Sequence, residues 1–572
     1  MARRVLSWAL VMVVAWTVGP VSAQQAVSPL KAIPGDVAVV VRVKGFKATL
    51  DKVAALADAV EAGRGQMVKL GGGAIGIGLK NHTMEGVDLA GDFYIAVFVE
   101  KDAAPGIVFI VPGKDLPAMK EALGEEVTFT ESGKHGIYSE DEDLITDIKD
   151  QLKSKEKDSF ADEIDAKSLA AMNRGDVSVF VNVPALLEVY KDELAQAKML
   201  IEGIKDQEPP TATPGINIAA LMGKLQVITE QLVQAVEDHE GITIALTVTD
   251  KDIVIEEFFK LDDESDSGKS LKSGTGSDMP LLNSLPADSL GYFAVQTDFT
   301  KMMAWSMDLV ESIIEDEKML AAIKGSMAEM KTIKFNGMAG SFNMGKPTGG
   351  VVNMVNLLSV DDPKKVRSLT QKYAGVLKEF EANGTKTEMT YKADAEKVGT
   401  TSIDLMNSKI TISDDAPNAE QQRMMMKAMY GEEGTSTRTA YLKDKIVQTT
   451  GGGKAAMEAA LKSVEGASRV VSPGLQSVKT KLGTKPNFVG LIDIAGIAVK
   501  SLGLAKEFGG ENLPFNPDDI TKGLSLKPSY IGFGIEVQDA AISVKTVIPV
   551  EQIKSLVQLG MKAQKAVQGV GN

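Results

Sequence analysis

The sequence predicts an α+β protein with two homologous halves, each containing one or more antiparallel sheets flanked by helices. The first observation is that residues 35–43, GDVAVVVRV, recur as residues 175–183, GDVSVFVNV. The second is that a strand–turn–strand pattern at residues 248–256 recurs at residues 537–545. The third is an acidic, Gly/Ser-rich stretch between the two sets of repeats. Because these matches keep their order, we expect repeated strand–helix–hairpin units.

Four strand openings form the framework of this prediction. The first half contains the two GDV runs, and the second half contains openings at residues 285–295 and 487–494. All four are apolar runs that precede a segment with helical periodicity. The helices expected after the openings span residues 48–62, 185–204, 305–317 and 495–508.

Alternating or short apolar runs indicate further strands. They span residues 93–99, 242–248, 403–412 and 439–449. Tight turns join most of them, which favours antiparallel sheets with helices packed on one face. A parallel, doubly wound sheet is the alternative, because several strands are followed by helices. The two repeated hairpins, each with an Asp at its turn, favour the antiparallel arrangement.

The expected organisation has four parts. Residues 1–23 form a signal peptide, residues 24–261 the first half, residues 262–281 a linker and residues 282–572 the second half. The linker begins DDESDSG and continues with further Gly and Ser, a composition typical of flexible connections. The alternative to duplication is chance similarity, since V-x-V-x-V runs are common among strands.

The N-terminus has the three parts of a secretory signal. Arg3 and Arg4 supply positive charge, residues 5–19 are apolar, and small residues precede a cleavage site between Ala23 and Gln24. An uncleaved membrane anchor is the alternative, but the apolar run is shorter than the roughly 20 residues that span a bilayer. We therefore expect an extracytoplasmic protein (periplasmic, surface-bound or secreted) with no integral membrane segment after cleavage.

Composition narrows the chemistry and the partners. The chain has no cysteine, which excludes disulfides, thiolate metal sites and cysteine nucleophiles, and which favours a bacterial host. Its net charge of −15 becomes more negative when Arg3 and Arg4 leave with the signal. This charge repels phosphate backbones, and no basic stripe interrupts it, so we expect no nucleic-acid partner.

Two glycine-rich motifs resemble nucleotide-binding loops but lack the required context. The Gly71–Gly76 run fits G-x-G-x-x-G, yet a helix is expected before it rather than a strand, which indicates a flexible loop. The run from Gly451 to Lys454 follows a strand and precedes a helix. It lacks the Walker spacing and has Ala455 where Ser or Thr would bind magnesium, which indicates a turn that starts a helix.

Neither the histidines nor the acidic run marks a catalytic or metal site. His82, His135 and His239 have no metal-ligand spacing, no G-x-S-x-G motif accompanies them, and each is expected in a solvated turn. The acidic run at residues 139–143 lacks the pattern of a calcium loop and is typical of a helix N-terminus. The sequence predicts no catalytic, cofactor-binding or metal residues and no cofactor.

Methionine is abundant, with 26 residues. The clusters at residues 424–429, 302–307 and 327–330 resemble thioether groups that bind Cu(I). Their helical spacing favours core filling or a pliable apolar surface.

The opening Leu285-Pro286-Ala287-Asp288-Ser289, followed by a strand and an amphipathic helix, resembles a family of large secreted bacterial proteins of unknown function. Ile33-Pro34-Gly35-Asp36 is similar to that opening. The resemblance covers about fifteen residues per copy. It implies an extracytoplasmic bacterial protein, and it carries no functional residues that could be transferred to this chain.

The sequence favours a non-catalytic extracytoplasmic binding or scaffold protein, whose ligand or protein partner it does not identify. The first alternative is a secreted hydrolase that uses Asp and Glu carboxylates in no recognisable pattern. The second is a Met-rich binder of apolar ligands or Cu(I). Whether the protein is an enzyme stays open at this point.

Overall fold

The computed structural model describes most of the chain between residues 29 and 569. Its description excludes residues 73–74, 154–158, 204–217, 273–275, 297–316, 346–349, 377–378, 383–384, 415–417, 432–433, 467–472, 484, 510–514 and 525. The chain divides into two compact units, each assembled from separate segments. Unit 1 comprises Met1–Gly203, Thr229–Ser273 and Val537–Lys554, and unit 2 comprises Ile204–Ile228, Gly274–Glu536 and Ser555–Asn572.

The prediction of two halves with separate sheets is wrong. The strands belong to one large sheet, and the pairings between the described strands are antiparallel. Strand β19 (Ala541–Pro549), which the sequence assigns to the second half, pairs with β8 (Asp252–Leu261) inside unit 1. The physical reason is that a hairpin leaves an open edge, whose N–H and C=O groups are satisfied by a further strand.

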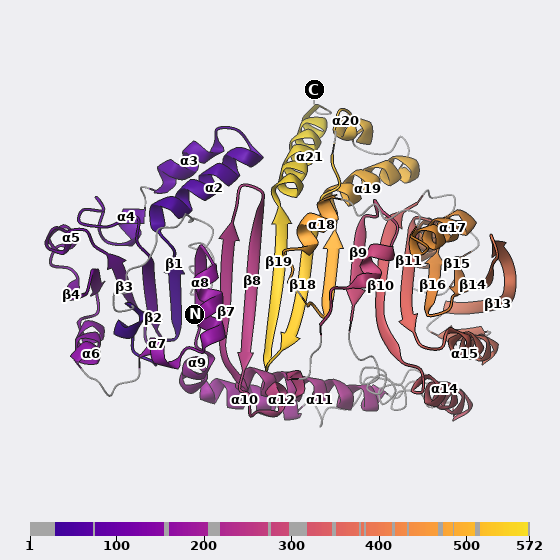
Figure 1. The fold of residues 1–572 in the computed structure, drawn as a ribbon, viewed down its shortest axis with the longest axis horizontal. Helices are drawn as coiled ribbons and strands as arrows, with labels where there is room; N and C mark the ends of the chain where they lie inside the picture. The colour runs from indigo at the N-terminus through magenta and orange to yellow at the C-terminus, as the bar shows by residue number, and fades with distance from the viewer. Residues whose placement is uncertain are drawn as a thin grey trace. The chain divides into compact units, whose positions relative to one another are not determined.

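In unit 1 the strands lie in the order β4–β5–β3–β2–β1–β6–β7–β8–β19 (Figure 1). Besides β8 and β19 they are β1 (Val39–Val43), β2 (Phe93–Phe98), β3 (Gly106–Pro112), β4 (Thr128–Ser132), β5 (His135–Ser139), β6 (Val177–Val181) and β7 (His239–Val248). The parallel, doubly wound alternative is therefore excluded for these strands.

Helices cover both faces of the unit 1 sheet, whereas the sequence predicted helices on one face. Val108 of β3 packs in one core cluster with Ile145 of α6, and the neighbouring Phe109 packs in another with Met119 of α5. Burial on both faces explains why β2 is a continuous apolar run and why β1 is apolar except for Arg42. The longer helices of unit 1 are α2 (Phe46–Val60), α3 (Arg64–Gly72), α5 (Leu116–Leu123), α6 (Glu142–Lys153), α8 (Ala166–Arg174), α9 (Val183–Val189) and α10 (Lys191–Glu202).

Short polar side chains set the first residue of several helices. Asp115 accepts a hydrogen bond from the backbone N–H of Ala118 at 3.1 Å and starts α5. Asn182 accepts from Ala185 at 3.2 Å and starts α9. A cap of this kind stabilises a helix by about 1 kcal/mol, because it satisfies a donor that has no partner within the helix.

Unit 2 repeats the succession of strand pairings seen in unit 1. Strand β9 lies between β10 and β17, as β1 lies between β2 and β6. Strand β11 pairs with β16, which pairs with β15, as β3 pairs with β5 and β5 with β4. The strands of unit 2 are β9 (Gly291–Val295), β10 (Phe335–Met344), β11 (Val352–Val360), β12 (Glu379–Ala382), β13 (Thr385–Val398), β14 (Thr401–Ile412), β15 (Thr435–Tyr441), β16 (Lys445–Thr450), β17 (Phe488–Ile492) and β18 (Ile531–Gln538).

Three helices near the C-terminal end of unit 2 pack together. An apolar cluster joins Ala495 of α19 with Ile520 of α20 and Leu559 of α21. This cluster lies beside the strand ends that matter for the site described below. The helices are α14 (Glu317–Met330), α15 (Pro363–Val376), α16 (Ala419–Tyr430), α17 (Gly453–Val464), α18 (Pro473–Lys479), α19 (Ile494–Gly509), α20 (Pro517–Thr521) and α21 (Val550–Gly569), of which residues from Ser555 on belong to unit 2.

The pairing of β8 with β19 has the register of a local two-fold axis. The opposed pairs include Asp252 with Pro549, Glu256 with Lys545, and Lys260 with Ala541. The sequence repeat aligns residue 256 with residue 545, so the two central residues are equivalent positions of the repeat. Glu256, almost buried, also accepts hydrogen bonds from Arg174 at 3.0 and 2.7 Å.

Several local predictions are confirmed and others need correction. The helix expected at residues 48–62 is α2, and the one expected at residues 495–508 is α19. The helix expected at residues 185–204 is divided into α9 and α10 at Tyr190. Residues 439–449 are a hairpin rather than one strand, because Leu442 turns the chain by donating to the carbonyl of Lys445. The helix expected at residues 305–317 lies almost entirely outside the described residues.

Candidate functional site

Three cavities on the described surface are candidates for ligand sites. A cavity of about 310 Å³ lies at the start of α19 in unit 2; we call it the α19 cavity. A groove of about 530 Å³ between α2 and α3 of unit 1 is the α2–α3 groove. A third, the α16 pocket, has a volume of about 250 Å³. Their lining residues differ in chemistry, and that difference decides what each could bind.

One face of α19 supplies the polar wall of the α19 cavity. Asp493, Gly496 and Lys500 line it at helical spacing, and Asp493 is nearly buried. The Asp493 carboxylate accepts a hydrogen bond from the backbone N–H of Gly496 at 2.9 Å, which holds it at the helix start. Leu290, Val499, Leu524 and Leu526 supply apolar walls.

The opposite wall is the loop that contains the Leu-Pro-Ala-Asp-Ser sequence. The Tyr292 hydroxyl donates to the carbonyl of Pro286 at 3.0 Å and accepts from the N–H of Ser289 at 2.9 Å. The buried Tyr530 hydroxyl donates to the Ser289 carbonyl at 3.0 Å. Between these anchors, Asp288 has φ +59°, a left-handed conformation that Asp tolerates better than most residues. The loop therefore presents a fixed, exposed carboxylate at the cavity.

Lys500 is the cation on the inner wall of the α19 cavity. Its side chain is half-buried, and its ammonium group donates to the side-chain oxygen of Asn343, which is neutral. Burial lowers the pKa of Lys500, and the nearby Asp493 carboxylate opposes this only in part. Among the described ion pairs, none joins Lys500 to a carboxylate. The cavity thus holds a half-buried cation whose loss of hydration the Asp493 carboxylate offsets only in part.

The α2–α3 groove is apolar along its length. Val53, Leu56, Val60 and Val68 line it together with Met67 and Ile553. Met67 is about half exposed, and Leu70 on the same helix is three-quarters exposed. The ion pair between Glu61 and Arg64, at 3.0 Å, lies at the rim.

The α16 pocket combines basic and apolar residues. Met426 lines it, while Met424 and Met425 are exposed on the same helix. The Arg423 guanidinium, also in the lining, donates to the carbonyl of Ile412 at 3.1 and 2.7 Å and so serves to hold the strand end. The second methionine cluster, at residues 302–307, lies outside the described residues.

The predictions for the histidines are partly correct. His82 is exposed in a turn, as expected. His135 begins β5 and His239 begins β7, both half-buried, so the expectation of solvated turns is wrong for them. The His239 ring packs edge-on against Phe259 at 6.2 Å between centroids. Burial lowers the pKa of His135.

The glycine-rich motifs occupy structural positions. The run from Gly451 to Gly453 turns the chain from β16 into α17 with three positive φ angles, which confirms a helix-initiating turn. The first glycine run lies at the end of α3 and the start of the short helix α4 (Ile75–Gly78), so the expected loop is largely helical. The acidic run at residues 139–143 is the start of α6, where Asp141 accepts from the N–H of Asp143 at 3.0 Å.

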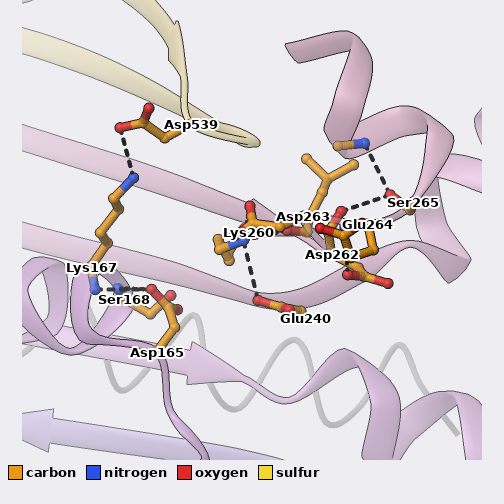
Figure 2. A network of polar contacts seen from close by, with 12 residues as sticks. Asp165, Lys167, Ser168, Glu240, Lys260, Asp262, Asp263, Glu264, Ser265 and Asp539 are labelled. Carbon is orange, nitrogen blue, oxygen red and sulfur yellow. Dashed lines mark hydrogen bonds and ion pairs between the residues drawn. The ribbon is translucent and has the colours of Figure 1, made fainter. Parts of the chain in front are cut away.

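The stretch expected as a linker is folded at its start (Figure 2). The buried Lys260 donates to Asp263 at 3.0 Å and pairs with Glu240 at 3.4 Å. Ser265 then starts α12 (Asp266–Leu271) by accepting from the N–H of Gly268 at 2.9 Å. These contacts extend the core of unit 1 beyond the predicted boundary at residue 261.

The described part of the chain has neither a metal-binding cluster nor a membrane-spanning helix. No group of three or more His, Asp or Glu side chains there is arranged to hold a metal ion. No helix there combines the length and the apolar character needed to cross a bilayer. The predicted cleavage residues, Ala23 and Gln24, lie outside the described residues.

Comparison with known proteins does not assign a family. No protein-family model, no curated protein and no solved structure matches this chain. The cavities are therefore the features of this chain that indicate what it could bind. Sequence reasoning missed Lys500 and Asp493, because a Lys and an Asp two helical turns apart are common and only the fold places them around a cavity. The spacing of residues 493, 496 and 500 on one apolar helix was the available signal.

Proposed function

We propose that the protein is a non-catalytic binding or scaffold protein that acts outside the cytoplasm and holds an apolar molecule or segment in the α2–α3 groove. The groove carries this proposal, because its lining is apolar and its outer residues, Met67 above all, are exposed to solvent. Contiguous apolar surface that remains exposed on a folded protein is typical of binding sites.

Burial of this surface would provide the binding energy. Each Å² of apolar surface removed from water contributes about 25 cal/mol, so covering a groove lined by aliphatic side chains contributes several kcal/mol. Methionine suits such a surface, because its unbranched, polarisable side chain adapts to occupants of different shape. The ion pair of Glu61 and Arg64 at the rim would help to keep the protein soluble when the groove is empty.

Secretion and the resemblance to secreted bacterial proteins are also part of the proposal. N-terminal sequencing of the exported protein should identify Gln24 as its first residue.

The groove is tested with a neutral fluorescent naphthylamine probe, which brightens in apolar sites. The wild-type protein should bind the probe, and Met67→Lys should weaken binding about tenfold, because an ammonium group placed in the groove loses hydration. The matched control is Met199→Lys, which changes an equally exposed methionine of α10 that does not line the groove.

Equal probe binding by wild type and Met67→Lys would contradict the groove as the binding site. Catalysis is tested separately with glycan, ester and peptide substrates. Turnover by the purified protein that disappears when one Asp or Glu is changed would replace the binding proposal with the carboxylate hydrolase.

A further inference from the structure

The α19 cavity has the size and composition of a small-molecule site. Its volume, about 310 Å³, lies at the lower end of the range typical of ligand pockets. Its lining comes from three segments of unit 2: the first two turns of α19, the stretch from α20 to β18, and the loop before β9, which is about 200 residues earlier in the sequence. Such sites combine apolar walls with a few polar groups that orient the ligand.

The lining of the α19 cavity carries equal numbers of cations and anions. Lys500 and Lys527 supply two cations, and Asp288 and Asp493 supply two anions. Asp493 is already engaged by the N–H of Gly496, whereas Asp288 is exposed on the loop that two tyrosine hydroxyls hold in place. A ligand with one positive and one negative group would find a partner for each charge in this lining.

Lys500 favours an anionic group on the ligand. Its ammonium group is half-buried against the neutral amide oxygen of Asn343. A ligand carboxylate in the cavity would replace lost hydration with a charge-assisted hydrogen bond, which is about twice as strong as a neutral one. Burial also lowers the pKa of Lys500, and an anionic partner would restore it.

Asp288 favours a cationic group on the same ligand. Asp288 is exposed in the lining, and hydrogen bonds with the hydroxyls of Tyr292 and Tyr530 hold the neighbouring Ser289, so its carboxylate is placed to pair with a ligand ammonium group. Leu290, Val499 and Leu524, which also line the cavity, offer apolar contacts to the body of the ligand.

We propose that the α19 cavity binds a small zwitterion with an apolar body, of which an apolar α-amino acid is the simplest example. The ligand carboxylate pairs with Lys500, its ammonium group pairs with Asp288, and its side chain contacts the aliphatic walls. This site and the α2–α3 groove are formed by different residues, so either proposal can fail without the other.

Isothermal titration calorimetry on the full mature wild-type chain provides the first test. L-leucine is the probe, and leucinamide and 4-methylpentanoate are analogues that lack the carboxylate or the amine. We expect leucine to bind at least tenfold more tightly than either analogue, which corresponds to about 1.4 kcal/mol for each lost charged pair. No binding of leucine or phenylalanine at millimolar concentration would overturn the proposal. Equal binding of either analogue would also overturn it.

Three variants then place the ligand in the cavity. Lys500→Met and Asp288→Asn should each weaken leucine binding about tenfold, because each removes one charge while retaining a similar shape. Lys506→Met is the matched control, since Lys506 is an exposed residue of the same helix that pairs with Asp518 and does not line the cavity. Circular dichroism and thermal melting establish that each variant folds. Unchanged affinity in folded Asp288→Asn, or an equal loss in Lys506→Met, would contradict the assignment.

Discussion

Asp404 illustrates how single charged residues are used inside this protein. Its carboxylate is buried and accepts hydrogen bonds from Arg367 at 2.7 Å, from the backbone N–H of Asp394 at 2.9 Å and from the Tyr391 hydroxyl. Arg367 also lies over the ring of Tyr441, 5.8 Å from its centroid. A buried carboxylate with this many donors stabilises the strands and the helix that supply them.

Removing the Asp404 charge should therefore destabilise unit 2. We expect Asp404→Asn to lower the free energy of unfolding by about 3 kcal/mol, because the buried position loses its charge and Arg367 keeps only its ion pair with the exposed Asp394, at 3.0 Å. Urea unfolding at neutral pH provides the measurement. Asp414→Asn is the control, since Asp414 is exposed and pairs with Arg423 at the surface. A loss as small as that of the control would show that Asp404 contributes little.

The same residue predicts a pH dependence. Burial raises the pKa of Asp404, but hydrogen bonds from Arg367 and Tyr391 outweigh this and hold it below its usual value. A carboxylate with a lowered folded-state pKa contributes stability above its unfolded pKa, near 3.8, and loses it as pH falls toward the folded value. The difference between wild type and Asp404→Asn should therefore be full at neutral pH and shrink below about pH 4.

At the scale of elements, two glycines in the turn between β16 and α17 are required for different physical reasons. Gly451 and Gly453 both have positive φ, at 73° and 63°. A Cβ on Gly451 would lie 2.0 Å from the carbonyl oxygen of Val352, whereas one on Gly453 would meet nothing within 4 Å. The first position requires glycine for space and for φ, and the second for φ alone.

Substituting Ala at each position should show the energetic cost of positive φ separately from the cost of the steric clash. Gly453→Ala should lower the free energy of unfolding by about 1 kcal/mol, which is the cost of a left-handed residue with a side chain. Gly451→Ala should cost clearly more, because the backbone of β11 must move to admit the methyl group. Thermal melting of the two variants checks the order. Equal losses would mean that the turn adjusts freely.

At the scale of the whole molecule, the C-terminal strand completes unit 1. Strand β19 pairs along its length with β8, although nearly 300 residues of sequence separate them. The flexibility of the predicted linker, residues 262–281, remains a prediction. It does not divide the paired strands into separate bodies, because unit 1 includes Val537–Lys554.

Limited proteolysis should reveal this arrangement. A cut after α12, within residues 272–278, would place β8 in one fragment and β19 in the other. We expect the two fragments to elute together on gel filtration in native buffer and to separate in urea, because the β8–β19 ladder holds them. Fragments that separate without denaturant would show that the ladder is too weak to join them.

The sequence by itself determined most of the local structure. The GDV runs and the Gly451 turn lie in the predicted elements, because β-branched runs and positive φ act over a few residues. Errors at this level occur where two short elements share one apolar pattern, as at residues 439–449.

Only the tertiary structure decided how the strands join and where a ligand could bind. Strand β19 pairs with β8, and Asp288 and Lys500 line one cavity. In both cases the residues are more than 200 positions apart in the sequence. Such pairings depend on which open edges and apolar faces remain after the local elements have formed. Periodicity and capping describe one element at a time, and they contain no information about the partner that an edge or a face will meet.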